Sequence, residues 1–469
     1  MSRESKLVKN TFILAIGTFL PKLAAFLTTP ILTGYLTKEQ YGTYDLVGVL
    51  VGLVLPIATL QIHTAGFRFL VGHKDDRDLA KLYLSNILAF VIPVCLATLF
   101  VTYFFLPSDD PMIRLWICIY LFFDTIVSEF RQITRGMSRN LDYSISAIIS
   151  ACVKLILAVV LVQLMKQELL GAIVAVALSP VLSLLFLFFK IRAYELISPK
   201  VVEWKVIKEM LAYAWPMVPN NMSSWVIRMS DRFVVTGFMG LAANAVYAAA
   251  CKIPSLLTLA QTTFSMAWQE NASIFSKDKD VDKYYSKMFG AMMNFYAGSL
   301  GLIIAATPVL FPLLIRGKGY EEAYDQMPIL FMAMFFHCMA AFFGGIYIAF
   351  KATKSVGITT LVAAAVNLVV DLVLIKSIGL YAASGSTLVS YIFLFVYRMI
   401  DVRKLVKIKY DPVQVAIIIG LLLIESALFF FKTLTFNLIN FAIALVAAVV
   451  LNRQIIKAIL RKVFKRRKG

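Results

Sequence analysis

Long apolar stretches separated by short polar segments make up almost the whole chain. We identify fourteen apolar runs of helix length, which begin near Thr11, Thr43, Leu79, Met112, Tyr143, Leu169, Val206, Ala245, Ser286, Tyr324, Val356, Ile378, Val413 and Leu434. A helix needs about 20 apolar residues to cross the hydrocarbon layer of a membrane. The runs lack the ten-residue alternation that is typical of membrane β-strands. The pattern therefore predicts an all-α polytopic membrane protein with about fourteen transmembrane helices.

The overall composition agrees with this class. Hydrophobic residues make up 60% of the chain and charged residues 16%, which is far from the balance of a soluble globular domain. The first run, residues 11–36, is too long for the core of a signal peptide and ends without a small-residue cleavage pattern. We therefore expect it to be retained as the first span.

The distribution of Lys and Arg predicts the orientation of the chain. Cationic loops resist translocation and collect on the cytoplasmic side of a membrane. When the loops are assigned alternately to two sides, 34 of the 46 Lys and Arg residues fall on the side of the N-terminus and 6 on the other side. We therefore predict that both termini are cytoplasmic, which agrees with an even number of spans.

A short internal repeat divides the chain. Thr33-Gly34-Tyr35-Leu36 returns as Thr236-Gly237-Phe238-Met239, and at the same offset of 203 residues Tyr44 returns as Tyr247 and Lys74-Asp75 as Lys277-Asp278. We expect an N-terminal lobe over residues 1–195 with spans 1–6 and a C-terminal lobe over residues 196–410 with spans 7–12. Residues 411–469 would add spans 13–14 and a basic cytoplasmic tail. Transporters built from repeats hold their site between them, so we predict two six-helix lobes, related as a parallel repeat, around a central cavity.

Ionisable side chains inside the apolar runs are the main indication of function, because each costs about 2.5–3.5 kcal/mol at the centre of a bilayer. The acids are Asp124, Glu129, Asp231, Glu270, Asp371 and Glu425, and the cations are Lys22, Arg68, Arg114, Lys154, Arg228, Arg232 and Lys252. Within one turn of the same helix, no acid accompanies Lys22, Lys154 or Lys252. A cavity lined by cations favours an anionic substrate, and a diphosphate is the obvious membrane-borne candidate.

Other interpretations of these charges stay open. Arg228 and Asp231 are three residues apart and Arg232 is one turn from Arg228, so Asp231 can serve an internal ion pair. Arg68 and Arg114 lie near the ends of their spans and can extend to the membrane interface. A cation exporter would expose acids in its cavity, and acids are comparably numerous here.

Metal and nucleic-acid binding are not indicated. The five Cys residues lie inside apolar runs without paired spacing, and the three His residues have no partner at a metal-ligand spacing. The net charge of +19 reflects mainly the cytoplasmic loops and the tail Arg461–Lys468. Such a tail is most simply a patch for anionic lipid rather than for nucleic acid.

Several short motifs occur in the order and spacing of one known family. They are Tyr41-Gly42-Thr43-Tyr44-Asp45-Leu46, Ala65-Gly66-Phe67-Arg68-Phe69, Pro216-Met217-Val218-Pro219-Asn220-Asn221 with Ser224-Trp225 and Ser230-Asp231-Arg232, Lys252-Ile253-Pro254, Ala267-Trp268-Gln269-Glu270, and the stretch from Ala352-Thr353-Lys354 to Gly379-Leu380-Tyr381-Ala382-Ala383. Over about 400 residues the chain resembles the bacterial polysaccharide flippases of the Wzx type. These belong to the multidrug/oligosaccharidyl-lipid/polysaccharide exporter superfamily, together with the multidrug-and-toxin extruders and the lipid II flippases.

The resemblance implies a flippase of the bacterial cytoplasmic (inner) membrane. It would move an undecaprenyl-diphosphate-linked oligosaccharide from the inner to the outer leaflet by alternating access, for the synthesis of O-antigen or capsule. The residues expected to bind the diphosphate are Lys22, Arg68, Arg228, Arg232, Lys252 and, from its charge, Lys154. Those expected to contact sugar are Asn220, Asn221, Trp225, Tyr247, Trp268 and Gln269. Those expected to couple or gate transport are Glu270, Asp231, Asp124 and Asp371, with an ion pair between Glu270 and Arg68 as a hypothetical cytoplasmic gate.

The expected partners follow from the same resemblance. We expect a lipid-linked oligosaccharide substrate, membrane lipids, no nucleic acid and no bound cofactor, with coupling to a proton or sodium gradient left open. A polysaccharide polymerase or glycosyltransferase is a plausible partner, and the two-lobed chain is expected to act as a monomer. The first span offers Lys22, a point charge without the bidentate fork of arginine, which argues against lipid II itself as the substrate.

Two rival functions are weighed against the flippase. An ion-coupled multidrug antiporter would expose acids rather than cations in its cavity. A polysaccharide polymerase or ligase would carry catalytic residues on a large outer loop, whereas the longest predicted outer loops here are residues 107–112 and 317–324. The chain is therefore expected to be a transporter and not an enzyme, with the identity and length of the sugar left open.

Overall fold

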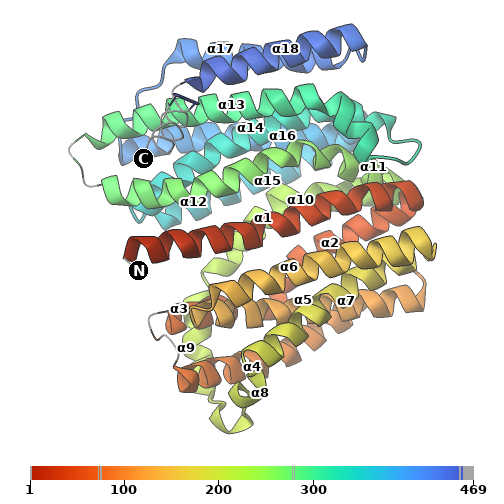
Figure 1. The fold of residues 1–469 in the computed structure, drawn as a ribbon, viewed down its shortest axis with the longest axis vertical. Helices are drawn as coiled ribbons and strands as arrows, with labels where there is room; N and C mark the ends of the chain where they lie inside the picture. Colours follow the sequence, from red (N-terminus) through yellow and green to blue (C-terminus); the bar gives the residue numbers. More distant parts are fainter. Residues whose placement is uncertain are drawn as a thin grey trace, which may run out of the picture. The chain divides into compact units, whose positions relative to one another are not determined.

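The computed structural model describes residues 3–71, 73, 76–276, 278, 280–453 and 456–457. These residues form helices and connecting turns without any β-strand among them, so the predicted all-α class is confirmed. The helices of the first half are α1 (Arg3–Tyr35), α2 (Lys38–Thr59), α3 (Ile62–Leu70), α4 (Arg77–Tyr103), α5 (Pro111–Gly136), α6 (Asn140–Leu157), α7 (Glu168–Lys190), α8 (Ala193–Leu196) and α9 (Trp204–Ala214). Those that follow are α10 (Met217–Met239), α11 (Leu241–Lys252), α12 (Leu257–Phe275), α13 (Val281–Leu314), α14 (Glu321–Ala349), α15 (Thr353–Ile378), α16 (Leu380–Asp401), α17 (Pro412–Phe429) and α18 (Leu434–Leu451) (Figure 1).

Twelve helices in the described part of the chain are long and apolar enough to cross a membrane. A pair bent by 42°, Leu241–Lys252 with Pro254–Thr262, brings the number to thirteen if it forms one broken span. The predicted number of fourteen is therefore not confirmed. The remaining predicted run contains α10, which has 23 residues but carries three charged side chains, Arg228, Asp231 and Arg232. Because of these charges, α10 is not apolar enough to count among the twelve candidate spans.

Three of the predicted apolar runs are interrupted. The second run divides into α2 and α3 because Leu60 and Gln61 adopt left-handed backbone conformations, with φ of 43° and 60°. The seventh run divides just before Pro216, and Pro219 lies in the first turn of α10, where a missing N–H costs little. The eighth run divides at Pro254 between α11 and α12. The predicted runs are thus correct in position but not as continuous helices.

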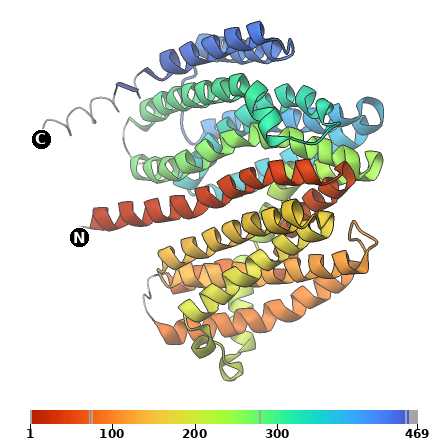
Figure 2. The same cartoon turned by 45° about the vertical axis from the view of Figure 1, so that its right-hand side comes forward.

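The chain forms two compact units. The first comprises Met1–Trp225 with Met239–Ala245 and Leu314–Gly317, and the second comprises Val226–Phe238, Val246–Leu313 and Lys318–Gly469. In the first unit α6 lies beside α1 and α7, and α7 lies beside α5 (Figures 1 and 2). Small residues allow this close packing, because a Cβ added at Gly17 of α1 would meet Ser144 of α6.

The second unit is built around α14. This helix lies beside α12, α15 and α16 and buries a series of aromatic side chains, which includes Phe331, Phe335, Phe342 and Phe343. The last two helices, α17 and α18, form a hairpin at the end of the chain (Figure 2). Large apolar residues on this hairpin are exposed, for example Ile417 at 61% and Val446 at 62%. An apolar surface of this kind is suited to contact with lipid.

The internal repeat is visible in the helix boundaries. α1 ends at Tyr35 and α2 begins at Lys38, and at an offset of 203 residues α10 reaches Met239 and α11 begins at Leu241. The repeated Lys74-Asp75 and Lys277 lie outside the described residues, as does the basic tail Arg461–Lys468. The repeat therefore marks equivalent turns between two equivalent pairs of helices.

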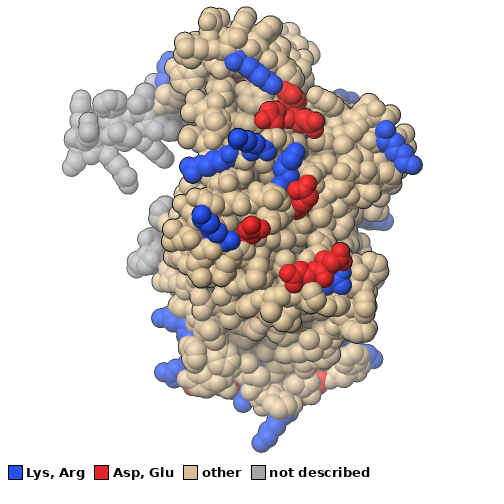
Figure 3. All heavy atoms as spheres, turned by 90° about the vertical axis from the view of Figure 1, so that its right-hand side faces the viewer, with Lys and Arg blue, Asp and Glu red and all other residues tan. Residues whose placement is uncertain are grey.

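One face of the surface carries few charged residues (Figure 3). Figure 3 shows one face, on which basic and acidic side chains lie in small groups of both signs among uncharged residues. Ion pairs at exposed helix ends include Arg114 with Asp109 at 3.0 Å and Lys432 with Asp325 at 2.8 Å. The face drawn there does not carry the single-sign patch that nucleic-acid binding requires.

Candidate functional site

The most organised polar cluster of the second unit surrounds Asp231 on α10. This carboxylate is 2% exposed, and its Oδ2 accepts hydrogen bonds from the Thr387 hydroxyl of α16 at 2.5 Å and from the Tyr247 hydroxyl of α11 at 2.8 Å. The Tyr247 oxygen also lies 3.3 Å from the carbonyl oxygen of Ala383. Three helices therefore bring oxygen atoms together at one buried acid.

A second buried acid belongs to the same cluster. Asp371 on α15 is fully buried, and neither of its carboxylate oxygens has a hydrogen-bond partner among the described residues. One turn before it, Asn367 is also fully buried, and its Oδ1 accepts a hydrogen bond of 3.2 Å from Ser230. The cluster thus contains two carboxylates, an amide oxygen, three hydroxyls and a nearby backbone carbonyl.

The charge of this cluster indicates what it can bind. Arg232 lies 5.8 Å from the centre of the Tyr247 ring and supplies one positive charge beside the two acids. If Asp231, Asp371 and Arg232 are all ionised, these three buried side chains carry one net negative charge, because Arg228, one turn before Asp231, is exposed. A buried charge without compensation is costly. A proton or a monovalent cation held by these oxygens would neutralise it. Hard oxygen donors of this type are suited to alkali and alkaline-earth cations rather than to soft metals.

The first unit contains a cavity of about 210 Å³ between α1, α5, α6 and α7. Asp124, Arg131 and Lys154 line it, and the last two carry charges that act on Asp124. Arg131 donates hydrogen bonds of 3.0 Å to Ser146 Oγ and Ser183 Oγ. Two predicted site residues, Asp124 and Lys154, thus lie in one cavity. If Asp124, Arg131 and Lys154 are all ionised, the cavity carries one net positive charge.

Arg131 is a polar residue of this cavity that was not singled out from the sequence. It lies inside α5 and is half-buried among serine side chains of α6 and α7. A second polar contact of this unit was also missed: His63 Nδ1 of α3 lies 3.0 Å from Glu129 Oε1 of α5, and both are buried. Sequence spacing gave no signal for either contact, because the partners are on different helices.

The predicted diphosphate-binding cations divide equally between the units. Lys22, Arg68 and Lys154 belong to the first unit, and Arg228, Arg232 and Lys252 belong to the second. Arg68 and Arg228 are exposed, whereas the other four are half-buried or buried. The grouping of all six around one ligand stays a prediction, as does the gate between Arg68 and Glu270, which is exposed.

The aromatic residues expected to contact sugar are already engaged in packing. Trp225 donates a hydrogen bond of 3.1 Å to the carbonyl oxygen of Val49, and Trp268 donates one of 2.9 Å to that of Phe342. Trp225 is 9% exposed, and Trp268 and Tyr247 are each 2% exposed. These three side chains pack within the helix bundles in this conformation, and their contact with sugar stays a prediction.

The amide residues are more accessible. Asn220 and Gln269 are half-buried, and Asn221 donates a hydrogen bond of 2.8 Å to Gln61 at the break between α2 and α3.

No group of three or more His, Cys, Asp or Glu side chains with the geometry of a metal site occurs within the described ranges.

Comparison with known proteins places this fold. The family model for polysaccharide biosynthesis proteins matches residues 7–269, and no curated protein matches the chain. The solved structure of the lipid II flippase MurJ in an inward closed conformation has a TM-score of 0.70 at 14% identity, over 96% of this chain and 100% of that one. An inward-facing multidrug-resistance MATE transporter of the MOP superfamily has a TM-score of 0.66 at 12% identity, over 84% of this chain and 98% of its own.

A third structure extends the comparison. A MOP superfamily transporter from Pyrococcus furiosus has a TM-score of 0.60 at 14% identity, over 85% of this chain and 95% of its own. At these identities the likeness shows a common fold. The apolar helices and this common fold indicate a multi-pass membrane protein.

Proposed function

The chain belongs to the polysaccharide biosynthesis protein family and has the fold of the MOP superfamily transporters, and from this premise we propose that it is a flippase for a lipid-linked oligosaccharide. The family match over residues 7–269 is the observation that carries the proposal. The substrate would be an undecaprenyl-diphosphate-linked oligosaccharide that crosses from the inner to the outer leaflet of the bacterial inner membrane by alternating access.

The charges inside the helices support an anionic lipid-linked substrate. Arg68 and Arg228 are exposed, one in each unit, and are thus available to a diphosphate. Arginine is suited to this role because its planar guanidinium forms two parallel hydrogen bonds to a phosphate. Lys22, Lys154, Arg232 and Lys252 would add positive charge during the reaction cycle. The hydroxyl-rich sugars would be held by amides such as Asn220 and Gln269 rather than by the buried aromatic rings.

Transport against a gradient requires coupling, and we assign it to the Asp231–Asp371 cluster. Both acids are buried, and one monovalent cation or proton would neutralise the charge that remains beside Arg232. Oxygens of Asn367, Thr387 and Ala383 would complete the donors. Binding and release of the cation would then bias α10, α11, α15 and α16 between two arrangements.

The arrangement in the membrane completes the proposal. The bias of Lys and Arg to one side supports cytoplasmic termini. Because one chain contains both repeated halves, we expect a monomer to be the transporting unit, with polymerising or glycosyl-transferring membrane proteins as functional partners.

The proposal is tested by translocation in sealed proteoliposomes. A fluorescent undecaprenyl-diphosphate oligosaccharide is reconstituted with the protein, and its movement is read by protection from an impermeant reagent. We expect wild type to flip the lipid, Arg68→Ala and Lys252→Ala to lose most of the activity, and Lys376→Ala to retain it. Lys376 is a matched control because it is also a membrane-helix cation with an aromatic contact, 5.5 Å from the Phe238 ring, but is exposed and not among the predicted diphosphate-binding residues. Transport of a cationic dye without flipping would instead support the multidrug antiporter.

A further inference from the structure

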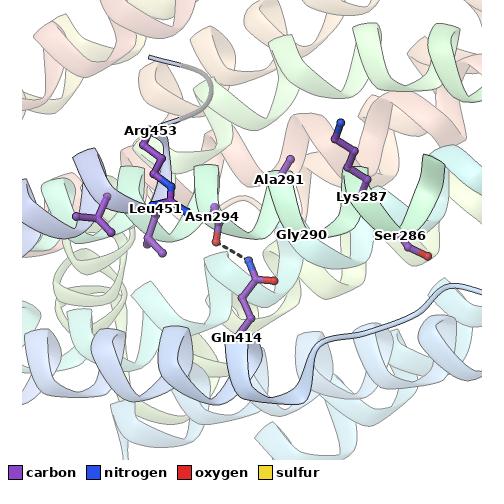
Figure 4. A pocket seen from close by; sticks show the side chains of 9 residues that line it. Ser286, Lys287, Gly290, Ala291, Asn294, Gln414, Leu451 and Arg453 are labelled. Atoms are coloured by element: carbon purple, nitrogen blue, oxygen red, sulfur yellow. Dashed lines mark hydrogen bonds between the residues drawn. The ribbon is translucent and has the colours of Figure 1, made fainter. Parts of the chain in front are cut away.

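A groove of about 510 Å³ opens where α13, α17 and the end of α18 meet in the second unit. Its lining comprises Ser286, Lys287, Gly290, Ala291, Asn294, Gln414, Val450, Leu451 and Arg453 (Figure 4). None of these residues belongs to the diphosphate, sugar or coupling sets described above. The groove therefore requires its own explanation.

The floor of the groove is built by hydrogen bonds between the three helices. Gln414 Nε2 of α17 donates to Asn294 Oδ1 of α13 at 2.8 Å, a bond that crosses the groove in Figure 4. Asn452, just after α18, donates to the Asn294 carbonyl oxygen at 3.3 Å. Gly290 faces the same floor, because a Cβ added there would lie 3.4 Å from Gln414 Oε1. These contacts fix the spacing between the three helices.

Two cations lie at this groove without a carboxylate to balance them. Lys287 and Arg453 are both exposed, and neither makes an ion pair within the described residues. Two acids at the starts of α13 and α17 hydrogen-bond backbone groups and form no ion pair with these cations among the described residues. Asp282 accepts a hydrogen bond of 3.0 Å from the Lys407 N–H, and Asp411 caps α17 by accepting from the N–H groups of Val413 and Gln414. The groove thus combines two positive charges with amide donors and is suited to an anion.

The surroundings identify the anion as part of a lipid. Val450 lines the groove and is 57% exposed, and along the same helix Val446 and Val449 are 62% and 51% exposed. An acyl chain could therefore follow α18 away from a headgroup held at Arg453. This end of α13 follows the cation-rich segment 277–287 that we predict to be cytoplasmic, and the cytoplasmic leaflet is the one rich in anionic lipid.

We propose that this groove binds the phosphate of an anionic membrane phospholipid between Lys287 and Arg453, separately from the transported substrate. The lipid would tie the α17–α18 hairpin to α13 on the cytoplasmic side. Each basic residue near an anionic surface contributes about 1 kcal/mol, which corresponds to about a fivefold change in affinity. Loss of both cations should therefore weaken lipid binding by about 25-fold.

The test measures lipid binding and not transport, so it is independent of the proposed flippase activity. The full-length protein is purified in nanodiscs of mixed phosphatidylglycerol and phosphatidylcholine, and retained lipids are counted by native mass spectrometry. Wild type should retain one phosphatidylglycerol in preference to phosphatidylcholine, and the double variant Lys287→Gln/Arg453→Gln should lose this preference. Lys354→Gln, which removes another exposed cation of the second unit, should retain it.

A second variant keeps the test decisive if removal of charge disturbs folding. Ala291→Leu fills the groove with an apolar side chain and leaves both cations in place, and it should also lose the retained lipid. Equal retention of phosphatidylglycerol by wild type and both groove variants would overturn the proposal. So would a preference for undecaprenyl diphosphate over phosphatidylglycerol that is lost in the double variant, because the groove would then bind the carrier lipid instead.

Discussion

Replacement of Asp371 by asparagine tests whether the buried acids of the second unit form a cation site. The two side chains have nearly the same shape, but asparagine carries no charge. Asp371 is fully buried, its two carboxylate oxygens have no hydrogen-bond partner among the described residues, and it lies one turn after Asn367, which Ser230 contacts. Asp371→Asn should therefore remove the need for a cation while it preserves the packing of α15.

The magnitude follows from binding linkage. A ligand that binds only the folded protein at 100 times its dissociation constant stabilises it by about 2.7 kcal/mol. With an unfolding entropy of about 2.1 cal/mol/K per residue, this corresponds to a shift of about 3 °C in Tm for a chain of 469 residues. Without the cation, the variant should be at least as stable as wild type, because an ionised acid inside a membrane helix costs about 2.5–3.5 kcal/mol.

The assay is thermal unfolding of purified protein in sodium, potassium and choline chloride at equal ionic strength. Wild type should gain about 3 °C in saturating sodium, and Asp371→Asn should gain nothing. Glu425→Gln is the matched control, because Glu425 on α17 is also fully buried with both carboxylate oxygens unpartnered. If a proton occupies the site, the same gain should appear on acidification in choline and again be absent in Asp371→Asn. A full cation-dependent gain in that variant would refute the assignment.

Two further predictions concern packing. Gly345→Ala should lower the free energy of unfolding by about 1–3 kcal/mol, because its Cβ would lie 2.5 Å from the Trp268 indole. Gly357→Ala, where a Cβ meets nothing within 4 Å, is the control, and equal Tm values for the two variants would contradict this reasoning. His63→Ala should cost about 1–3 kcal/mol because it leaves the buried Glu129 carboxyl without its hydrogen-bond partner. Addition of Glu129→Gln should recover part of that Tm loss, and no recovery would show that the pair is not the cause.

The helical architecture could be predicted from sequence because the signal is long and local. An apolar run of about 20 residues identifies a span without knowledge of its neighbours, and the predicted starts at Leu79 and Val413 lie within two residues of the starts of α4 and α17. Prolines at 216 and 254 mark two of the three interruptions. The third, at Leu60 and Gln61, has no local signal, because these residues rarely adopt positive φ and do so here within a tertiary context.

The candidate site was predicted only in part, because only some of its residues give a local signal in the sequence. Asp231 and Asp371 stand out because each acid is costly in an apolar run. Asn367 and Thr387 do not stand out, because neutral polar residues are common in membrane helices and their value depends on which helices are neighbours. Arg131 was not singled out, because a cation near the end of an apolar run can belong either to the loop or to the helix interior. Individual charges are thus visible in sequence, whereas their convergence is a property of the fold.

The internal repeat shows how two equivalent halves acquired different chemistry. Tyr44 and Tyr247 are equivalent at the offset of 203 residues, and each ring carries a cation, Lys154 at 5.4 Å and Arg232 at 5.8 Å. At the position equivalent to Asp231, however, the first half has Thr28, whose hydroxyl donates to a carbonyl of its own helix. The first half therefore has no acid at the position of Asp231, and the acid that shares a cavity with Lys154 is instead Asp124 on α5. For that reason we expect a cation site with the geometry of the Asp231 cluster in the second unit only, although the repeat has preserved the aromatic ring in both.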